Sequence, residues 1–548
     1  MTRLSFILFF LLSNNVFSQY SVPKSILKQI ESIDSNAIKK HVTFLADDQL
    51  KGRYPGSEGY QMAVDYVVNQ FKSLNITPAG EKNSYLQKVQ LRNSKLVKNH
   101  SSITVDFQNG KTKNLVLGED LIIFPHPEQK SITINAPLVF VGAGFDSPQF
   151  GFNDYNRLDV KGKIVVIMRK TPENVSENVK RHLTYNATYQ DFAAKNGAIG
   201  VLLCNYANSV AQFKVLAKST MEDGIKASIN DQGLRVSSSN HVGGKIQLMG
   251  RITVQALKEI MNAETDNFDK IWQKLENGQY VSMPMKSTIH GQYESAFNDI
   301  ISYNLIGKIE GSDRKLKNEY VIHSGHLDHI GITKPVNGDS INNGAHDNAS
   351  GIACSLEIAR MYSEMKVKPK RSILFVFVTA EEMGLLGSGY FVANPTVPKN
   401  KIVADINTDM PTIIAPFESA APLGAEHSSL QKTVEQAAKL LNIYVETDPE
   451  PTEGRFVRSD QYNFLKGGIP ALHIKYGYKF SNPALGLAEK VKIFRENHYH
   501  KPSDEVNDSF VWAAGRKFAQ LNFLVSYIVA QSKTRPNWNK GDFFNPIH

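Results

Sequence analysis

Cysteine is nearly absent from this chain. Only 2 of its 548 residues are cysteines, Cys204 and Cys354, and each lies in an apolar segment of a different predicted unit. We therefore expect two buried free thiols rather than a disulfide, and a fold that is stabilised by its cores. Beyond the N-terminal segment, the sequence also lacks the run of roughly 20 apolar residues that a membrane-spanning helix needs. No integral membrane segment is expected in the mature chain.

The chain also lacks blocks of one charge. Its 62 lysines and arginines outnumber its 53 acidic residues, for a formal net charge of +9, but they are spread along the whole length. Proteins that bind nucleic acids concentrate basic residues in arms or patches, so this pattern predicts a solvated surface and no nucleic-acid partner. The basic balance favours acidic substrates or an anionic envelope surface only weakly.

The N-terminus has the pattern of a secretory signal peptide. Arg3 precedes an apolar run, Leu4–Leu12, and Val16 and Ser18 occupy positions −3 and −1 of a cleavage site. The alternative is a short membrane anchor, which is disfavoured because the run is well under the roughly 20 residues that span a bilayer. We expect residues 1–18 to be removed and the protein to be exported, either to the periplasm or out of the cell.

Two patterns divide the remaining chain, whose length predicts two or three domains. Between about 116 and 251, short buried runs and glycine turns predict a small β-rich unit with its own core. Between 287 and 532, strands and helices alternate, which predicts an α/β fold with a mostly parallel, mixed sheet flanked by helices. The expected units are a signal peptide at 1–18, an N-terminal part of the main domain at 19–115, the inserted unit at 116–251, a helical return at 252–286, the main domain at 287–532 and a tail at 533–548.

The hydrophobic pattern also predicts individual elements. Helical spacing predicts a helical start between Ala37 and Gly80. The expected strands of the main sheet are Tyr303–Ile309, Tyr320–Ser324, Ser372–Thr379, Ile402–Asn407 and Ala471–Lys475. The helices expected between and after them are Asn348–Met365, Ser428–Leu441 and Val511–Ala530.

Acids and histidines stand where these strands end. His326 emerges at the carboxyl end of the first such strand, and Asp328 lies two residues on. We expect the Asp328 carboxylate to accept the other ring N–H of His326 and so to fix its tautomer. His329 is better explained as a hydrogen-bonding loop histidine.

Asp347 follows a glycine-rich loop at the start of a predicted helix. A carboxylate at this position can bridge two cations through its two oxygens. The alternative is that Asp347 and Asn348 simply cap the helix, which is the commoner use of both residue types.

Glu381 and Glu382 follow a strongly apolar strand. Adjacent residues leave a strand end in different directions, so one can ligate a metal while the other faces the substrate. A carboxylate beside an activated water is the arrangement for general base catalysis. Two further candidates follow: Asp409 at another strand end, and His500, whose claim is stronger than that of His498 because a proline and an aspartate come after it.

The whole donor set suits zinc. Two histidines with several carboxylates match a hard-to-borderline ion, and the oxygen ligands are enough for two metals rather than one. Co²⁺ and Mn²⁺ are possible substitutes.

Taken together, these segments resemble the M28 family of zinc peptidases, the aminopeptidase and glutamate-carboxypeptidase group. The HLD, HDNASG, EEMGLLGS, NTDM and YHKPSD segments match the motifs of that family in order, and the resemblance covers most of the mature chain. In the β-rich unit, VKGKIVVI and GAIGVLL resemble the protease-associated domain that is inserted in many members. The early segment LADDQLKGRYPGSEGYQMA resembles the start of exported members.

The resemblance implies a role for each candidate. One zinc would be held by His326, Asp347 and Asp409, and the other by Asp347, Glu382 and His500, with Asp347 bridging. Glu381 would be the general base, and Asp328 would be the partner of a metal ligand. The chain departs from many members in having His346 where they carry a second Asp, a position that is not expected to be a ligand.

Residues for substrate binding are harder to predict. The segment GRFVRSD resembles the substrate loop of the family, which makes Ser459 and Asp460 candidates to orient the substrate or the metal ligands. Arg455 or Arg458 could receive a substrate carboxylate, with ordinary surface arginines as the alternative. Tyr476 is a candidate pocket wall, with core packing as the alternative.

The preferred hypothesis is that the protein is an exported metallo-aminopeptidase that acts on peptides. A carboxypeptidase or dipeptidase on the same scaffold is the second, and it needs cationic groups for the free carboxylate. A glutaminyl cyclase is a third, which two bound zincs would disfavour because those enzymes work with one. A non-catalytic receptor is the fourth, but such receptors are expected to have lost metal ligands, whereas every ligand position is filled here.

Overall fold

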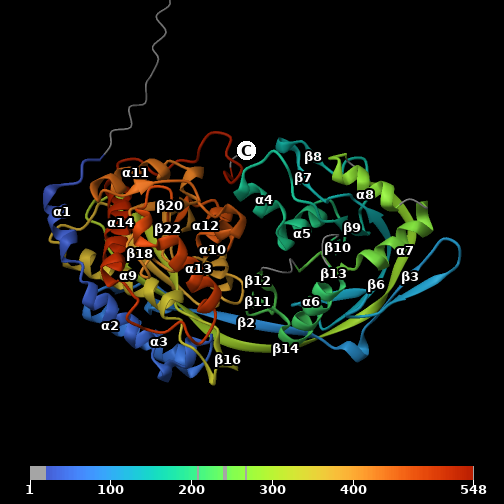
Figure 1. Cartoon of the computed structure of the whole chain (residues 1–548), viewed down its shortest axis with the longest axis horizontal. Helices are drawn as coiled ribbons and strands as arrows, with labels where there is room; N and C mark the ends of the chain where they lie inside the picture. Colours follow the sequence, from blue (N-terminus) through green and yellow to red (C-terminus); the bar gives the residue numbers. More distant parts are fainter. Residues whose placement is uncertain (1–19, 206–208, 239–242, 266–267, 280, 547–548) are drawn as a thin grey trace, which may run out of the picture.

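The computed structural model describes residues 20–205, 209–238, 243–265, 268–279 and 281–546. The predicted signal peptide lies outside these residues. Figure 1 shows two lobes side by side, bridged by two long strands, β2 (Leu86–Leu96) and β14 (Met283–Ile309). These two strands pair antiparallel from Ser295 to Leu305 of β14, so a continuous ribbon links the lobes.

The first lobe contains the mixed, mostly parallel sheet that the sequence predicts. Its order is β14–β18–β15–β19–β22–β20, in which β18, β15, β19 and β22 are parallel and the two outer strands antiparallel. The bounds are β15 Tyr320–His326, β18 Ser372–Val378, β19 Ile402–Asn407, β20 Ser419–Leu423 and β22 Ala471–Tyr476. The expected strands are confirmed, except that Tyr303–Ile309 is only the end of the 27-residue strand β14.

Helices cover both faces of this sheet. The predicted helices are present as α2 Ser35–Leu45, α3 Glu58–Ser73, α9 Ser350–Glu364, α11 Leu430–Leu440 and α14 Trp512–Gln531. Their apolar faces join one core with the sheet, in which residues such as Val42, Ile352, Phe375 and Leu524 are fully buried. The sequence patterns did not predict α10 Leu386–Ala393, α12 Gln461–Lys466 or α13 Leu487–Asn497.

The second lobe is the β-rich unit, and it has its own core. Its sheet runs β5–β13–β10–β9–β6 and continues through the first half of β14 to β3 and β4; β13, β10, β9 and β6 are parallel. The strands are β3 Ser102–Asp106, β4 Thr112–Leu115, β5 Leu121–Phe124, β6 Ser131–Phe140, β9 Ile164–Met168, β10 Gly200–Cys204 and β13 Leu248–Ile252. The helices are α4 Glu177–Leu183, α5 Asn186–Lys195, α6 Val210–Asp223, α7 Val254–Thr265 and α8 Phe268–Glu276. The lobe therefore extends beyond the expected 116–251 on both sides.

The lobes also touch directly. His182 in α4 lies 2.7 Å through Nδ1 from the hydroxyl of Tyr462 in α12. Phe543 and Phe544 of the C-terminal tail pack against His182, so the tail is a strap over the junction. Figure 1 shows the tail ending between the two lobes.

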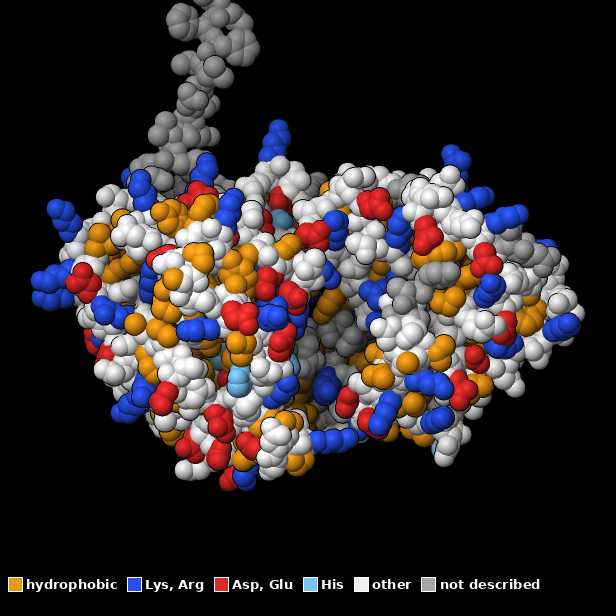
Figure 2. All heavy atoms as spheres, viewed as in Figure 1, with side chains coloured by type: hydrophobic (Ala, Val, Ile, Leu, Met, Phe, Trp, Pro, Cys, Tyr) orange, Lys and Arg blue, Asp and Glu red, His pale blue; other side chains and the backbone are white. Residues whose placement is uncertain are grey.

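The structure bears on the cysteines, on membrane-spanning helices and on the distribution of surface charge. Cys204 and Cys354 are both free and buried, as predicted. Among the described residues, no helix is long and apolar enough to cross a membrane. Figure 2 shows Lys and Arg side chains interspersed with Asp and Glu over the visible face, which agrees with the dispersed charge of the sequence.

Candidate metal centre

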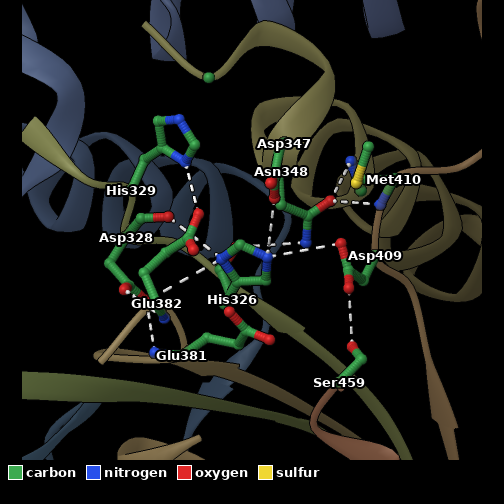
Figure 3. A network of polar contacts seen from close by, with 12 residues as sticks. His326, Asp328, His329, Asp347, Asn348, Glu381, Glu382, Asp409, Met410 and Ser459 are labelled. Atoms are coloured by element: carbon green, nitrogen blue, oxygen red, sulfur yellow. Dashed lines mark hydrogen bonds and ion pairs between the residues drawn. The ribbon is translucent and has the colours of Figure 1, made fainter. Parts of the chain in front are cut away.

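The candidate residues meet at the carboxyl ends of β15, β18 and β19 (Figure 3). The carboxyl ends of neighbouring parallel strands open on the same edge of a sheet, and the loops that leave them converge there. His326 is the last residue of β15, whereas Glu381 and Asp409 follow β18 and β19 by a few residues. β18 and β19 are fully buried and β15 is buried beyond Tyr320, so these strands fix the direction in which each loop leaves the sheet.

Asp347 occupies the middle of the cluster. Its Oδ1 lies 3.2 Å from Nε2 of His326, and its Oδ2 lies 3.2 Å from Nε2 of His500. On the first side, Nε2 of His326 is also 3.4 Å from Oδ1 of Asp409. On the second side, Nε2 of His500 is 3.0 Å from Oε2 of Glu382. The two carboxylate oxygens of Asp347 therefore face two separate groups of donors.

The surroundings of His326 differ from the expectation in one respect. Its Nδ1 lies 3.1 Å from the backbone carbonyl oxygen of Asp328 but 4.0 Å from the carboxylate of that residue. The carboxylate instead accepts the backbone N–H groups of Glu381 and Glu382, at 3.2 and 3.4 Å. Asp328 thus orients the imidazole with its main chain and the two glutamates with its side chain.

Glu382 is held from both sides. Its Oε1 lies 2.7 Å from Nδ1 of His329, while Oε2 faces His500. His329 is fully buried, and it makes the hydrogen bond of a loop histidine rather than pointing into the cluster.

Glu381 lies beside the first group of donors. One of its carboxylate oxygens is within 4.8 Å of ligand-type atoms of His326 and Asp409. Burial raises the pKa of Glu381 well above its ordinary value; His326 opposes this shift, and the charge of Glu382 adds to it. A carboxylate with a raised pKa is able to hold a proton near neutral pH.

Asp409 is fixed through both its side chain and its main chain. Its Oδ2 accepts a 2.7 Å hydrogen bond from Ser459, and its carbonyl oxygen lies 2.8 Å from both Lys475 Nζ and His473 Nε2. Burial lowers the pKa of Lys475, although the charge of Asp409 opposes this effect.

Buried donor atoms without hydrogen bonds, grouped closely together, indicate a metal site. Asp409 Oδ1 and His500 Nε2 are buried, yet neither makes a hydrogen bond of acceptable geometry in the structure. Two groups of three residues place ligand-type atoms within 4.8 Å of one another: His326, Glu381 and Asp409, and His326, Asp347 and Glu382. Buried carboxylates crowded together need a cation or protons between them, so the residues present fit a divalent metal.

Comparison with known proteins identifies the family of this segment. Residues 304–525 match the model of peptidase family M28. This part of the chain belongs to peptidase family M28. The M28 segment begins near the end of β14 and ends within α14, so it contains every candidate ligand.

Relatives named for different activities match parts of this chain. A probable leucine aminopeptidase 2 of Aspergillus oryzae is 30% identical over 180 residues, which are 31% of this chain and 32% of that protein. Carboxypeptidase Q of Rattus norvegicus is 28% identical over 198 residues, 35% of this chain and 37% of that protein. The matches thus span about a third of these relatives. Among solved structures, an aminopeptidase from Aneurinibacillus sp. strain AM-1 covers 95% of this chain and 98% of its own, at 20% identity and a TM-score of 0.46.

An arginine outside the M28 segment supports the centre, and the sequence patterns did not single it out. Arg53 is buried, and it donates to the carbonyl oxygens of Leu327 at 3.0 Å, Asn343 at 2.5 Å and Gly344 at 3.1 Å, and also to that of Leu45. It therefore ties the loop after β15 to the loop that carries Asp347. The resemblance of the GRYPG segment to other exported members was the available signal.

Two polar residues within the M28 segment hold the loop of Asp347. Asp504 accepts the backbone N–H groups of His346 and Asp347 through its two oxygens, at 2.9 and 3.0 Å. Asn348 does more than cap a helix: Nδ2 donates to the carbonyl oxygen of Thr408 at 3.0 Å, and Oδ1 accepts the N–H of Met410 at 3.0 Å. Asn348 thereby links the loops of Asp347 and Asp409 (Figure 3).

The five predicted substrate-binding residues have different surroundings. A cavity of about 100 Å³ beside Asp409 is lined by Arg455, Arg458, Ser459 and Tyr476. Arg455 is buried and paired with Asp448 and Glu450, and its guanidinium lies over the ring of Tyr476, so it has no free charge to offer. Arg458 is exposed and donates to the hydroxyl of Tyr499 at 3.2 Å. Asp460 is fully buried, and burial raises its pKa to about 6.

Proposed function

We propose that this protein is an exported di-zinc exopeptidase, and specifically an aminopeptidase that releases N-terminal residues from peptides. The observation that carries the proposal is the position of Asp347. Its two oxygens each lie 3.2 Å from a different histidine, and each histidine also faces a second carboxylate. A bridging carboxylate with a donor group on either side is the arrangement that a two-metal hydrolase requires.

Each metal would have its own ligands. His326, Asp347 and Asp409 would hold one zinc, and Asp347, Glu382 and His500 would hold the other. When bound, the zinc ions supply Lewis-acid polarisation of the scissile carbonyl and lower the pKa of water. Oxygen and imidazole donors also accept Co²⁺ or Mn²⁺, so these ions are expected to substitute.

Glu381 would move the proton. Its carboxylate takes a proton from the attacking water and later passes it to the nitrogen of the leaving amine. Burial raises the pKa of Glu381, which favours its keeping the proton between the two transfers. The backbone N–H of Glu381 is held by Asp328, which keeps the carboxylate in place during the transfer.

The surroundings of Asp409 would position the substrate. Ser459 donates a hydrogen bond to the Asp409 carboxylate. Ser459 would therefore orient a metal-binding side chain rather than contact the peptide. The small cavity next to it, with the ring of Tyr476 as one wall, would accept the terminal side chain. Its volume of about 100 Å³ favours a short or medium side chain over a long peptide segment.

A carboxypeptidase is the second candidate, because one cation on the cavity rim is available. Arg458 lines the cavity and, in the described part of the chain, makes no ion pair with an acid. Arg458 could therefore receive a terminal carboxylate, whereas Arg455 is neutralised by its own acids and Lys475, which also lines the cavity, donates to the carbonyl oxygen of Asp409.

Two wider features belong to the same proposal. The N-terminal 18 residues would direct export, to the periplasm or outside the cell. The second lobe would be a protease-associated domain, supported by its parallel strands β9 and β10, which carry the VKGKIVVI and GAIGVLL segments.

A peptide-library digest tests the proposed activity. The purified protein, with its metal content measured, is incubated with peptides that are free or blocked at either end, and the products are identified by mass spectrometry. The aminopeptidase predicts two zinc ions per chain, removal of N-terminal residues and no cleavage when the amine is blocked. Trimming that depends on a free C-terminus establishes the carboxypeptidase instead, and metal-replete protein without cleavage of any peptide rejects both.

A further inference from the structure

The second lobe contains a cavity that the metal centre does not use. It has a volume of about 290 Å³ and lies at the carboxyl ends of the parallel strands β9, β10 and β13. Arg169 follows β9, Leu203 is near the end of β10, and Arg251 and Ile252 end β13, and all four line the cavity. The carboxyl edge of a parallel sheet is where open α/β sheets bind their ligands.

The cations of this cavity lack acidic partners. Arg169, Arg251 and Lys214 line it, and within the described residues none of the three makes an ion pair with a carboxylate. Arg251 Nη2 donates to Asn186 Oδ1 at 3.3 Å, while its Nε is buried without a hydrogen-bond partner. Burial, together with the charge of Arg169, lowers the pKa of Arg251 to about 10. Two neighbouring guanidinium groups thus repel each other at the wall of the same cavity.

Helix starts add to the positive field. The residues that begin α6, Ser209 and Val210, and those that begin α7, Val254 and Gln255, all line the cavity. The N-terminus of a helix carries a partial positive charge. Ser209 caps the N–H of Gln212 in α6 and Thr253 caps that of Ala256 in α7, so the helices contribute this field rather than a full set of free N–H groups. The two helices have 14 and 12 residues, so both are long enough for this effect.

The acids of the cavity do not cancel these charges. Asp120 accepts the backbone N–H of Val116 at 3.0 Å and lies 3.9 Å from Lys113, whose nearer partner is Glu259 at 2.7 Å, so its carboxylate is held by the backbone of its own turn. Glu119 is exposed at the rim, where water screens it. The inner wall, formed by the two arginines, therefore remains cationic.

Purely structural roles do not account for both arginines. Arg169 does contribute to the fold, since its Nη2 donates to the carbonyl oxygen of Thr184 at 2.8 Å and its guanidinium lies over the ring of Tyr189. These contacts leave the repulsion between the two half-buried arginines only partly offset, by Tyr189, and a charge withdrawn from water without a full counter-charge is costly. An anion between them removes that cost.

We infer that this cavity binds a small ligand through an oxyanion group, either a phosphate or a carboxylate, held between Arg169 and Arg251. Arginine pairs recognise both groups with paired, charge-assisted hydrogen bonds. The volume suits a small molecule or the end of a chain rather than a folded partner. The site lies in a different lobe from the metal ligands, so it does not depend on the proposed peptidase activity.

Calorimetric titration of the metal-loaded protein with inorganic phosphate, and separately with succinate, tests the inference at constant ionic strength. The parent is expected to bind at least one of the two anions with saturation. Arg251→Gln is expected to weaken that binding at least about tenfold, as expected for the loss of a charge-assisted hydrogen bond. Arg157→Gln, which removes an exposed arginine of the same lobe, serves as the matched control and should bind as the parent does. The probe that binds also tells whether the site prefers a phosphate or a carboxylate.

Two further variants keep the outcome unambiguous. Asp347→Ala disrupts the metal centre and should leave anion binding intact, whereas loss of binding in this variant would place the anion on the metal and overturn the inference. Lys214→Gln removes an exposed cation at the cavity, so it retains the fold even if Arg251→Gln does not. It should weaken binding severalfold. Parent-like affinity in both Arg251→Gln and Lys214→Gln, or no saturable binding of either anion by the parent, would also overturn it.

Discussion

Nδ1 of His329 lies 2.7 Å from Oε1 of Glu382, whereas Nε2 of His500 faces the other oxygen, Oε2, of the same carboxylate. His329 thus orients one proposed metal ligand by a hydrogen bond and packs its ring edge-to-face against another, His500. Partners of this kind orient the ligand and keep it charged, and their loss commonly lowers metal affinity by about 10–100-fold.

His329→Ala should therefore weaken the binding of the second zinc without abolishing it. Competition with a chelator, followed by metal analysis, measures the change. His290→Ala is the control, because His290 also pairs with an acid, Asp106, but does so in the other lobe. A His329→Ala protein that binds zinc as tightly as the parent contradicts the role given to this residue.

Glu381→Gln separates the proposed base from the ligands. The substitution keeps the size of the side chain and removes its ability to accept a proton, so turnover should fall by roughly 10²–10⁴-fold, the usual contribution of a general base. Metal content should stay near that of the parent. Because Glu381 also lies near His326 and Asp409, loss of one zinc in this variant would make it a ligand instead.

Asp347→Ala should lose metal at both positions, since one carboxylate faces both histidines. Metal analysis of the purified variant checks this, with Asp231→Ala as the control because the Asp231 side chain is 95% exposed. Retention of a single zinc would show that the bridge is needed for only one ion.

Arg53→Lys should lower stability, although charge is conserved. Lysine cannot reach the four carbonyl oxygens that Arg53 contacts, and each buried acceptor left without a partner costs about 1–3 kcal/mol. Thermal unfolding of Arg53→Lys, beside the exposed control Arg314→Lys, measures the loss. Equal melting temperatures for the two variants would show that the contacts of Arg53 are dispensable.

Stability should depend on pH through Asp405, which is fully buried in β19. Burial raises its pKa well above the ordinary value, so the folded chain keeps this proton at a pH where the unfolded chain releases it. The free energy of unfolding therefore falls as pH rises from about 4 through the raised pKa. Asp405→Asn lacks this loss, so its stability relative to the parent should grow between pH 5 and pH 7.5. Denaturant unfolding of both proteins, with metal chelated, gives the difference, and a difference that stays constant with pH contradicts the assignment.

The sequence predicted the main sheet because its central strands are continuous apolar runs. Ser372–Val378 is fully buried, so its pattern is unmistakable, and the acids beyond such strands had to meet at one edge. The first half of β14 was not predicted, because polar and apolar residues are mixed along Met283–Ile301 and no buried run marks it. Short helices such as α12 have too few turns for a periodic signal.

The residues that hold the loops of the metal centre in place could be predicted only in part. Arg53 lies 274 positions from Leu327, and nothing in the local pattern of a turn distinguishes a buried arginine from an exposed one. Asp328 was predicted as the partner of His326, but the contacting atom was not. The turn after β15 brings the backbone carbonyl of Asp328, rather than its carboxylate, to His326. Contacts of this kind depend on loop geometry, which spacing alone does not define.

The strand β14 makes the two lobes poor candidates for separation by genetic truncation. Its Met283–Glu294 stretch pairs with β6, and its Leu305–Ile309 stretch pairs with β18. A boundary placed anywhere within it leaves the edge of one sheet uncovered, and open sheet edges recruit other chains. A lobe expressed alone should therefore aggregate unless the missing part of β14 is restored. The shared strand makes the two lobes one structural unit rather than two separable domains.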